Sequence, residues 1–554
     1  MKQRIYIFLM IAVTSVSGQS SSEIYKKIQK LNTLGSVLYV AAHPDDENTR
    51  LISLFSNQYN YNTAYLSMTR GDGGQNLIGT ELLESLGLIR TQELLEARKI
   101  DGGQQFFTTA NDFGYSKHPD ETLEIWNKNE ILAQIVFRIR EFKPDVIINR
   151  FDHRTPGSTH GHHSSSAILS EMAFSLAANP KAYPEQLNDV AVWQPTRQFY
   201  NTSWWAYGSR EKFKNADKSN MITLESNPIN NLLGSSNAEI ASKSRSQHKS
   251  QGFGSSPGLG SQEEYLELIN GSIPNKNNPF QGIDTNWSRV KGGKAIGLLI
   301  EEILADFNFE KPYKSIQQLL KIHSKIKALK PGHWRTVKLK EVTNLVQYCL
   351  GLRLQFNTSK PTGVANTLTE ITLKALNPSP IKVSIEKIVG AVNLDTKQSL
   401  SKNKAWQEIK SILLPKVQTT PYWLIEKGDI GNYKVSNPDL KGLAETPNPI
   451  QAIFELNIDG NLILINVPLT FRSTDRVKGE VVENFQLVPK ITTQINERVI
   501  LFKENTPKKV SLIVTSHTEN LKGSVTLSTP KYWKISPSSQ DFYIPMAEVS
   551  QEFI

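Results

Sequence analysis

The stretch SVLYVAAHPDDE, residues 36–47, joins a continuous apolar run to a group of polar side chains. The run over residues 36–42 does not alternate between apolar and polar residues, which is typical of a strand buried on both faces of a parallel sheet. Pro44 cannot donate to a sheet ladder, so we expect the strand to end before it. His43, Asp45 and Asp46 are then predicted to lie at the carboxyl end of a buried strand.

Similar runs cover residues 61–68 and 144–149, and helical patterns cover residues 79–100 and 121–142 between them. This alternation predicts a Rossmann-like α/β domain, in which helices cover both faces of a parallel sheet. Ligands of such sheets bind beyond the carboxyl ends of the strands. The residues directly after each strand are therefore the candidates for function.

A second polar group follows the third apolar run. Residues 152–164 contain four of the ten histidines, which are His153, His160, His162 and His163. A helical pattern starts near His162, and a spacing of three residues lets His160 and His163 face one site. Two imidazoles and one aspartate around an ion, with an open position for water, would form a hydrolytic zinc site.

Two plainer interpretations of these groups stay open. The first group could be a strand-ending turn in which Asp46 caps a helix. The second could be a solvated polar loop.

Length and composition exclude several classes of protein. The chain has 554 residues, 38% of them apolar and 21% charged, which predicts several globular domains and excludes a disordered or collagen-like chain. The net charge of +10 is spread along the chain, which argues against a nucleic-acid-binding protein. The single cysteine, Cys349, excludes an internal disulfide framework and a cysteine-based zinc site.

The N-terminus resembles a signal peptide over residues 1–18. Lys2 and Arg4 precede an apolar run of about a dozen residues, which small residues follow, as in a cleavable export signal. The run is shorter than the ~20 residues that span a bilayer. We therefore expect a protein exported to the periplasm or the exterior, without a transmembrane segment; a buried N-terminal strand is the alternative.

The later chain changes its pattern. Residues 208–292, rich in Ser, Asn, Gly and Lys, are expected to form surface loops, and residues 315–329 an amphipathic helix before a linker. Alternation with a period of two, as at Ile371, Leu373 and Ala375, then predicts all-β sandwich (Ig-like) domains. The expected units are a signal peptide at 1–18, an enzyme domain at 19–330, a β-sandwich at 333–483 and a second β-sandwich unit at 484–554.

The second β unit is expected to contain strands at residues 510–514 and 532–535. The chain stops at residues 549–554, apparently inside a strand, which is compatible with a truncated form of a longer protein.

Four motifs resemble those of the PIG-L (LmbE-like) family of metal-dependent de-N-acetylases. Residues 42–47, AHPDDE, resemble its first motif, and residues 159–163, THGHH, resemble its second, with His162 in place of the usual aspartate. Residues 90–93, RTQE, resemble its Arg-x-x-Glu helix, and residues 246–251 resemble its later His-Ser/Thr-Gln segment. The resemblance covers residues 33–255 and does not reach the β region.

The resemblance implies a role for each matching residue. His43, Asp46 and His163 would bind zinc, for which Fe²⁺ is an alternative. Asp45 would be the general base, and His160 would stabilise the oxyanion or protonate the departing amine. Further candidates are Arg90 and Asp112 for substrate hydroxyls, with a structural ion pair or a turn as the alternatives, and His153, His162 and His248 for positions around the site.

Two other motifs have no assigned role. Residues 70–74, RGDGG, follow the second strand and form either part of the site or a tight glycine turn. Trp204 and Trp205 either stack on a sugar ring or pack in the core.

The sequence thus predicts an exported zinc-dependent hydrolase of linear amides. It would remove the acetyl group from an N-acetylated amino sugar of the N-acetylglucosamine type or from a glycoconjugate, and its β domains would contact a glycan or a cell surface. Two alternatives are an amidase for a larger amide conjugate and a non-catalytic carbohydrate-binding or adhesion protein. No nucleic-acid partner is expected.

Overall fold

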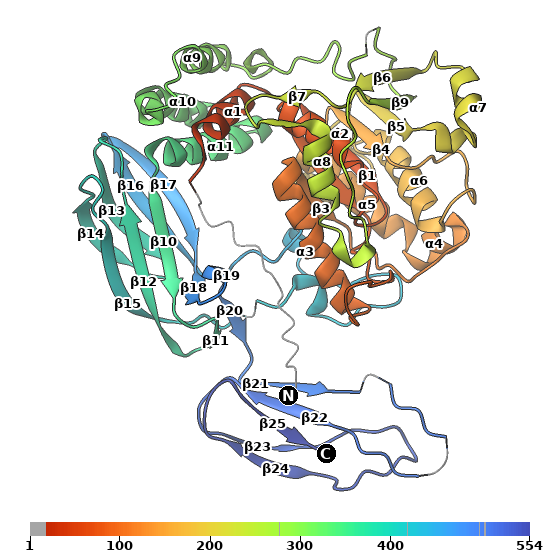
Figure 1. Cartoon of the computed structure of the whole chain (residues 1–554), viewed down its shortest axis with the longest axis vertical. Coiled ribbons are helices and arrows are strands. Elements are labelled where there is room, and N and C mark those ends of the chain that lie inside the picture. Colours follow the sequence, from red (N-terminus) through yellow and green to blue (C-terminus); the bar gives the residue numbers. More distant parts are fainter. Residues whose placement is uncertain (1–17, 276, 418, 498, 504–505) are drawn as a thin grey trace.

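The computed structural model describes residues 18–275, 277–417, 419–497, 499–503 and 506–554 (Figure 1). Nearly all of the expected signal peptide therefore lies outside the described residues. Among the described helices, none is long and apolar enough to cross a membrane.

The N-terminal half is built on a seven-stranded sheet with the order β3-β2-β1-β4-β5-β9-β6. The first five strands in this order pair in parallel, as predicted. At the other edge β9 pairs antiparallel with both β5 and β6. The strands are β1 (Ser36–Ala41), β2 (Asn62–Ser67), β3 (Gln104–Phe107), β4 (Val146–Asn149), β5 (Arg197–Thr202), β6 (Met221–Glu225) and β9 (Glu263–Asn270).

Helices cover both faces of this sheet. Alternate residues of β1 divide between two cores: Val37 and Tyr39 pack with α2 and α3, and Leu38 and Val40 pack with α5 and α6. These helices and their neighbours are α2 (Thr49–Ser53), α3 (Glu84–Asp101), α4 (Pro119–Ile125), α5 (Lys128–Phe142), α6 (Gly161–Leu176), α7 (Arg210–Asn215) and α8 (Asn237–Arg245).

The expectation of surface loops at residues 208–292 is wrong in part. This region contains α7, β6, α8 and β9, together with the short pair β7 (Ile229–Asn230) and β8 (Ser235–Ser236). In the edge strand β6 only Ile222 and Leu224 are buried, and both flank polar residues. The polar composition therefore concealed two strands that bury one face each.

The helix expected at residues 121–142 is likewise two helices, because Asn127 adopts a positive φ between α4 and α5.

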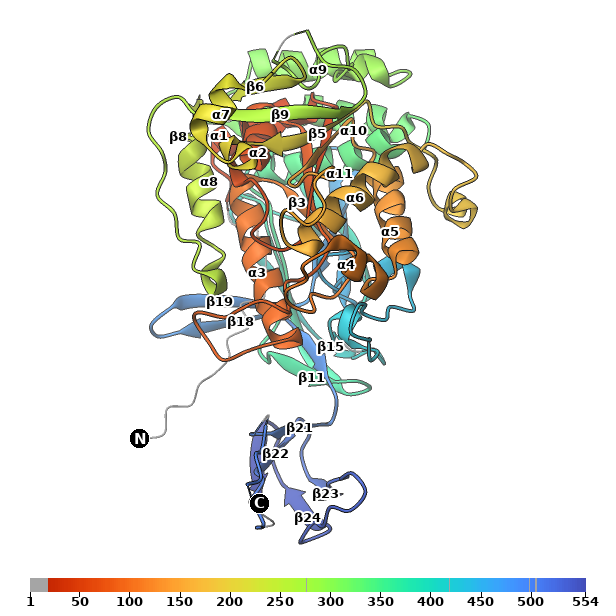
Figure 2. The ribbon, with the colours of Figure 1, turned by 90° about the vertical axis from the view of Figure 1, so that its right-hand side faces the viewer.

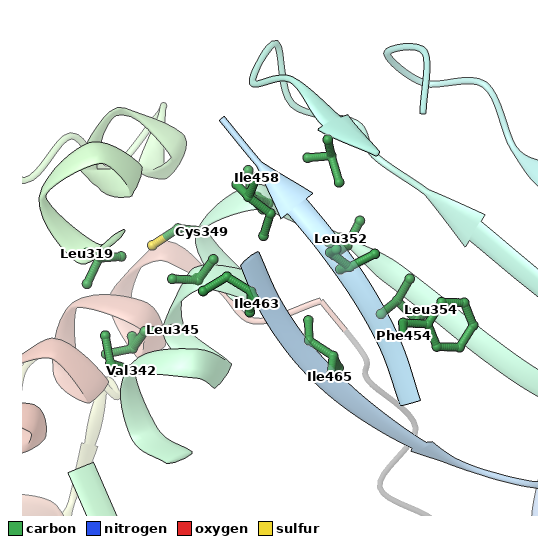
Figure 3. Close-up of a cluster of buried hydrophobic side chains, with 14 of the residues drawn as sticks. Leu319, Val342, Leu345, Cys349, Leu352, Leu354, Phe454, Ile458, Ile463 and Ile465 are labelled. Carbon is green, nitrogen blue, oxygen red and sulfur yellow. The ribbon is translucent and has the colours of Figure 1, made fainter. Parts of the chain in front are cut away.

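A layer of four helices shares one continuous core with the β region (Figure 3), whereas the two faces of the α/β sheet have cores of their own. The four helices are α1 (Ser21–Leu31), α9 (Lys294–Ala305), α10 (Ile316–Ala328) and α11 (His333–Leu350). The α11 helix occupies residues that we expected at the start of the β-sandwich; its Val342, Leu345 and Cys349 pack near Ile463 of β17. The proposed domain boundaries stay a prediction.

The C-terminal region consists of several sheets that are largely antiparallel. The predicted alternation is confirmed, for example in β16, where every second residue is buried. Two strand pairs, β10 with β18 and β11 with β20, are parallel, and the Ig-like assignment stays a prediction. The strands are β10 (Arg353–Thr358), β11 (Thr362–Val364), β12 (Leu368–Leu376), β13 (Val383–Gly390), β14 (Leu394–Ser399), β15 (Trp406–Leu413), β16 (Gln451–Ile458), β17 (Asn461–Pro468), β18 (Thr470–Asp475), β19 (Gly479–Asn484) and β20 (Gln486–Val488).

The last unit has small sheets of its own, drawn dark blue in Figure 2. The strand expected at residues 532–535 is absent from the structure, because Tyr532 has a φ of 78°, which is incompatible with an extended strand. The strands of this unit are β21 (Ile491–Ile495), β22 (Leu512–Ser516), β23 (Leu521–Val525), β24 (Gln540–Ile544) and β25 (Val549–Phe553).

A long connection between β15 and β16, described over residues 414–417 and 419–450, leaves the β region and packs against the α/β sheet (cyan in Figure 2). Its contact centre is the buried guanidinium of Arg70, which donates to the carbonyl oxygens of Leu443 at 3.0 Å and Ala444 at 3.1 Å. The same group also donates to the Tyr422 hydroxyl at 3.1 Å and lies 3.3 Å from the centre of the Trp423 ring. We refer to residues 414–450 as the bracing segment.

Replacing Arg70 with lysine should destabilise the protein by about 2–3 kcal/mol, because an ammonium group cannot reproduce several planar hydrogen bonds and a stacking contact, and it leaves buried acceptors unsatisfied. Thermal unfolding of Arg70→Lys would measure this effect. The matched control is Arg476→Lys on an exposed turn, which should leave the melting temperature unchanged. An equal melting temperature for both variants would contradict this account of the contact.

Candidate metal centre and active site

The first half of the site is the turn that follows β1. The strand ends at Ala41, and the His43 backbone N–H donates to Asp46 Oδ2 at 2.8 Å. The His43 Nδ1 atom lies 3.1 Å from the same oxygen. The next helix, α2, is capped by the side chain of Asn48. Asp46 is therefore not the helix cap, and its carboxylate faces the histidines.

The second half comes from the start of α6. His160 is the N-cap of this helix, and its Nδ1 accepts a hydrogen bond from the His162 N–H at 3.1 Å. His163 Nε2 lies 3.4 Å from Asp46 Oδ1, and Phe151 stacks on the His163 ring at a centroid distance of 3.9 Å. The two polar groups of the sequence thus meet at the carboxyl edge of the sheet, which excludes a separate solvated loop.

Among the residues that the structure describes, two sets of three side chains could hold a metal ion, and they share His43. The first is the predicted set of His43, Asp46 and His163; the second is His43 with His160 and His162. In each set the ligand atoms lie within 4.8 Å of one another. Imidazole and carboxylate donors at this spacing suit zinc or ferrous iron. The second set was not foreseen, because His162 stands where the resembling motif has an aspartate.

Charge distinguishes the two sets. Burial raises the pKa of Asp46, but the nearby His163 and His43 outweigh it and hold that pKa below its usual range. Burial lowers the pKa of His163 to about 4 and also lowers the pKa values of His160 and His162. At His43 burial acts in the same direction, but the charge of Asp46 outweighs it and raises the pKa of His43. The first set thus combines an ionised carboxylate with imidazoles, a favourable donor set for a divalent cation.

Asp45 lies beside the first set in a strained conformation. Its φ is 90°, a region that residues other than glycine rarely adopt. Its backbone N–H donates to Glu47 Oε2 at 2.9 Å, and its carboxylate accepts from Arg90 Nη2 at 2.8 Å. Burial raises the pKa of Asp45 to about 6, although the charge of Arg90 acts in the opposite direction. The strain turns the Asp45 carboxylate away from that of Asp46.

Arg90 is buried on α3, and both of its terminal nitrogens donate hydrogen bonds within the protein. Besides Asp45, it donates to the Pro44 carbonyl oxygen at 2.5 Å and the Gly71 carbonyl oxygen at 2.9 Å. A side chain at Gly71 or Gly74 would collide with the Arg90 guanidinium. The RGDGG motif is therefore a glycine turn that makes room for Arg90, and Arg90 is part of an ion pair with Asp45.

Asp112 lies close to both possible ligand sets. Its carboxylate oxygens are 3.9 Å from His43 Nε2 and 3.7 Å from His162 Nδ1. Asp72 is its neighbour; burial, followed by the charge of Asp112, raises the pKa of Asp72 to about 7. Asp72 had no predicted role, although its position in the glycine turn after β2 is a signal that could have found it.

The bracing segment supports the loop that carries Asp112. The Asn111 N–H donates to the Gly431 carbonyl oxygen at 2.8 Å, and the Tyr433 N–H donates to the Thr109 carbonyl oxygen at 2.8 Å. Burial, followed by the charge of the nearby Asp72, raises the pKa of Tyr433. The β region thus contributes to the wall of the site, which no local pattern in the sequence indicates.

The two remaining motifs support the turn without reaching the ligand sets. His248 Nε2 lies 2.9 Å from Glu47 Oε1, and Arg98 donates to the same oxygen at 3.2 Å. Glu93 accepts from the Ser250 N–H and hydroxyl at 2.6 and 2.7 Å, so the α3 motif and the later motif are joined. His153 lies outside both sets, with its Nδ1 3.8 Å from Asp152.

Comparisons with known proteins agree with this placement. Residues 38–173 match the PIG-L family, described as GlcNAc-PI de-N-acetylase. No match to a curated protein was found. Among solved structures, N,N'-diacetylchitobiose deacetylase from Pyrococcus horikoshii is 18% identical over 32% of this chain and 67% of its own, with a TM-score of 0.26. The 4-carboxy-2-hydroxymuconate hydratase GalB from Pseudomonas putida is 14% identical over 44% of this chain and 99% of its own, with a TM-score of 0.29. The chain therefore contains a PIG-L domain over residues 38–173, the stretch that holds both candidate ligand sets.

Proposed function

We propose that this protein is an exported, zinc-dependent hydrolase that removes the acetyl group from an N-acetylated amino sugar or its conjugate. The observation that carries the proposal is the convergence of His43, Asp46 and His163 beside the carboxylate of Asp45, which belongs to neither ligand set, within the residues that match the PIG-L family. The signal-peptide pattern supports export, and the Ig-like β domains are proposed to contact a glycan or a cell surface.

His43, Asp46 and His163 are proposed to hold the metal, with Fe²⁺ as the alternative to zinc. Three protein ligands leave coordination positions open, as in hydrolytic zinc sites. A divalent cation bound there would polarise the amide carbonyl and lower the pKa of water.

Asp45 is the proposed base. Its carboxylate is fixed by Arg90 and accepts a proton from the attacking water as the tetrahedral centre forms. The role of Arg90 is then to orient Asp45, and direct contact with a substrate hydroxyl is the alternative role.

His160 is proposed to act on the opposite side of the amide. Its ring is half-buried at the start of α6, with its centroid 5.4 Å from that of His43. From there it can hydrogen-bond the oxyanion or protonate the departing amine. Asp112, close to His43, is proposed to contact a substrate hydroxyl.

The alternative is an amidase for a larger amide conjugate, which the same residues would support. Amine release from N-acetylglucosamine, its β-glycosides and bulkier N-acyl conjugates separates the two. Turnover of bulky conjugates alone would favour the amidase, and metal-independent glycan binding without turnover would favour the non-catalytic protein.

The variant His163→Ala should lose both bound metal and activity, because two ligands hold zinc much less tightly than three. Wild-type protein should contain about one equivalent of zinc per chain. The measurement is metal content by mass spectrometry together with amine release. His517→Ala, in the last β unit, is the control and should retain both properties. Full zinc content in His163→Ala would overturn this ligand set.

The variant Asp45→Asn should bind zinc normally and release amine at least about 100-fold more slowly, because the amide cannot accept the proton. Parallel assays of zinc content and of kcat on the preferred substrate check this result. Asp439→Asn, on an exposed turn, serves as the control. If kcat is unchanged in Asp45→Asn, another group is the base.

A further inference from the structure

A cavity lies beside the candidate metal centre. It has a volume of about 530 Å³, and its lining includes Arg150 after β4 and the pair Trp204 and Trp205 after β5. Glu47, at the end of the metal-centre turn, and Arg245, at the end of α8, complete the side that faces the centre. The cavity therefore continues the same carboxyl edge of the sheet.

Arg150 links this cavity to the metal centre. Burial lowers its pKa, but Tyr39, Asp46 and Glu264 act through space and raise it, and its positive charge in turn lowers the pKa of His163. Within the described residues, its guanidinium forms no hydrogen bond or ion pair. A charged group with five donors is thus held in a cavity with its hydrogen-bonding capacity unused.

Two of the three carboxylates in the lining are paired with cations, and the third, Glu263, accepts a hydrogen bond from the Tyr265 hydroxyl. Glu47 is bound by Arg98 and His248, and Glu264 forms an ion pair with Arg50 at 2.5 Å. The second guanidinium that faces the site, Arg245, has no carboxylate partner among the described residues. It donates to the Asp45 carbonyl oxygen at 3.4 Å and lies 4.4 Å from the centre of the Phe253 ring. Among the described residues, Arg150 and Arg245 are therefore the arginines of the lining that no carboxylate pairs with, and both are available to an anionic ligand.

The lining of the cavity also contains two tryptophans, Trp204 and Trp205. Trp204 and Trp205 stack on each other with a centroid distance of 4.8 Å, and Trp205 is 76% exposed. An exposed indole on a short helix contributes little to a core, whereas its face can pack against the apolar face of a sugar ring. The core-packing interpretation of Trp205 is therefore wrong.

We infer that this cavity binds an acidic sugar residue that is linked to the N-acetylated sugar held at the metal centre. Arg150 and Arg245 pair with the carboxylate, sulfate or phosphate of that residue, and Trp205 stacks on its ring. The preferred substrate is then an anionic glycan rather than a neutral one. This inference rests on the proposed function for the identity of the neighbouring sugar.

The test compares the affinities of two disaccharides for the zinc-loaded full chain, measured by isothermal titration calorimetry. One joins N-acetylglucosamine to glucuronic acid, and the other is neutral N,N'-diacetylchitobiose. Wild-type protein should bind the acidic disaccharide at least about tenfold more tightly, since a charge-assisted pair with Arg is involved. Arg150→Met should reduce this ratio to near one. Arg210→Met, which removes an exposed arginine near Trp204 but outside the cavity, should retain the wild-type ratio.

Trp205→Ala provides a second variant, because an exposed side chain can be removed without loss of the fold. Its affinity for both disaccharides should fall several-fold. Equal affinity of the wild-type protein for the two sugars, or an unchanged ratio in Arg150→Met, would overturn the inference, as would unchanged affinities in Trp205→Ala. Binding is scored separately from amine release, so a protein that binds acidic glycan without turnover would contradict the proposed function and not the cavity.

Discussion

The candidate metal centre depends on the backbone of Asp45, which is held at a φ of 90°. A residue other than glycine in this region costs about 1–3 kcal/mol and persists only where its surroundings hold it. Here Glu47 accepts from its N–H, and Arg90 binds both its carboxylate and the preceding carbonyl oxygen. The result is a turn in which two consecutive aspartates point to different places, one toward the histidines and one toward Arg90.

Buried arginines connect this turn to the rest of the molecule. Arg90 and Arg98 on α3 hold Asp45 and Glu47, and Arg70 binds the bracing segment of the β region. Breaking one partner of a buried charged network costs far more than an exposed ion pair, because the remaining charge stays desolvated. The contacts of Arg70 therefore connect the β region to the α/β domain beside the site.

The sequence predicted those parts of the fold whose signal is local. The buried strands, the amphipathic α10 and the alternating β strands follow from the period of their apolar residues, and the convergence of His43 with His163 follows from the geometry of parallel strands. Edge strands such as β6 were not predicted, because the composition of a strand that buries only two side chains resembles that of a surface loop. The Asn127 break between α4 and α5 depends on a backbone angle that no composition reveals.

Contacts between distant segments could not be predicted. Tyr433 is more than 300 residues from Asp72, and nothing near either residue signals that they meet. The second ligand set with His162 was not predicted either, because motif comparison assigns one role to each position, whereas the structure brings three imidazoles together around His43.

The most direct test of the account is a crystal structure of the zinc-loaded chain with anomalous scattering recorded at the zinc edge. The account predicts one zinc ion bound by His43, Asp46 and His163, with Asp45 uncoordinated and still paired with Arg90. Zinc bound instead by His43, His160 and His162, or coordinated by Asp45, would contradict it.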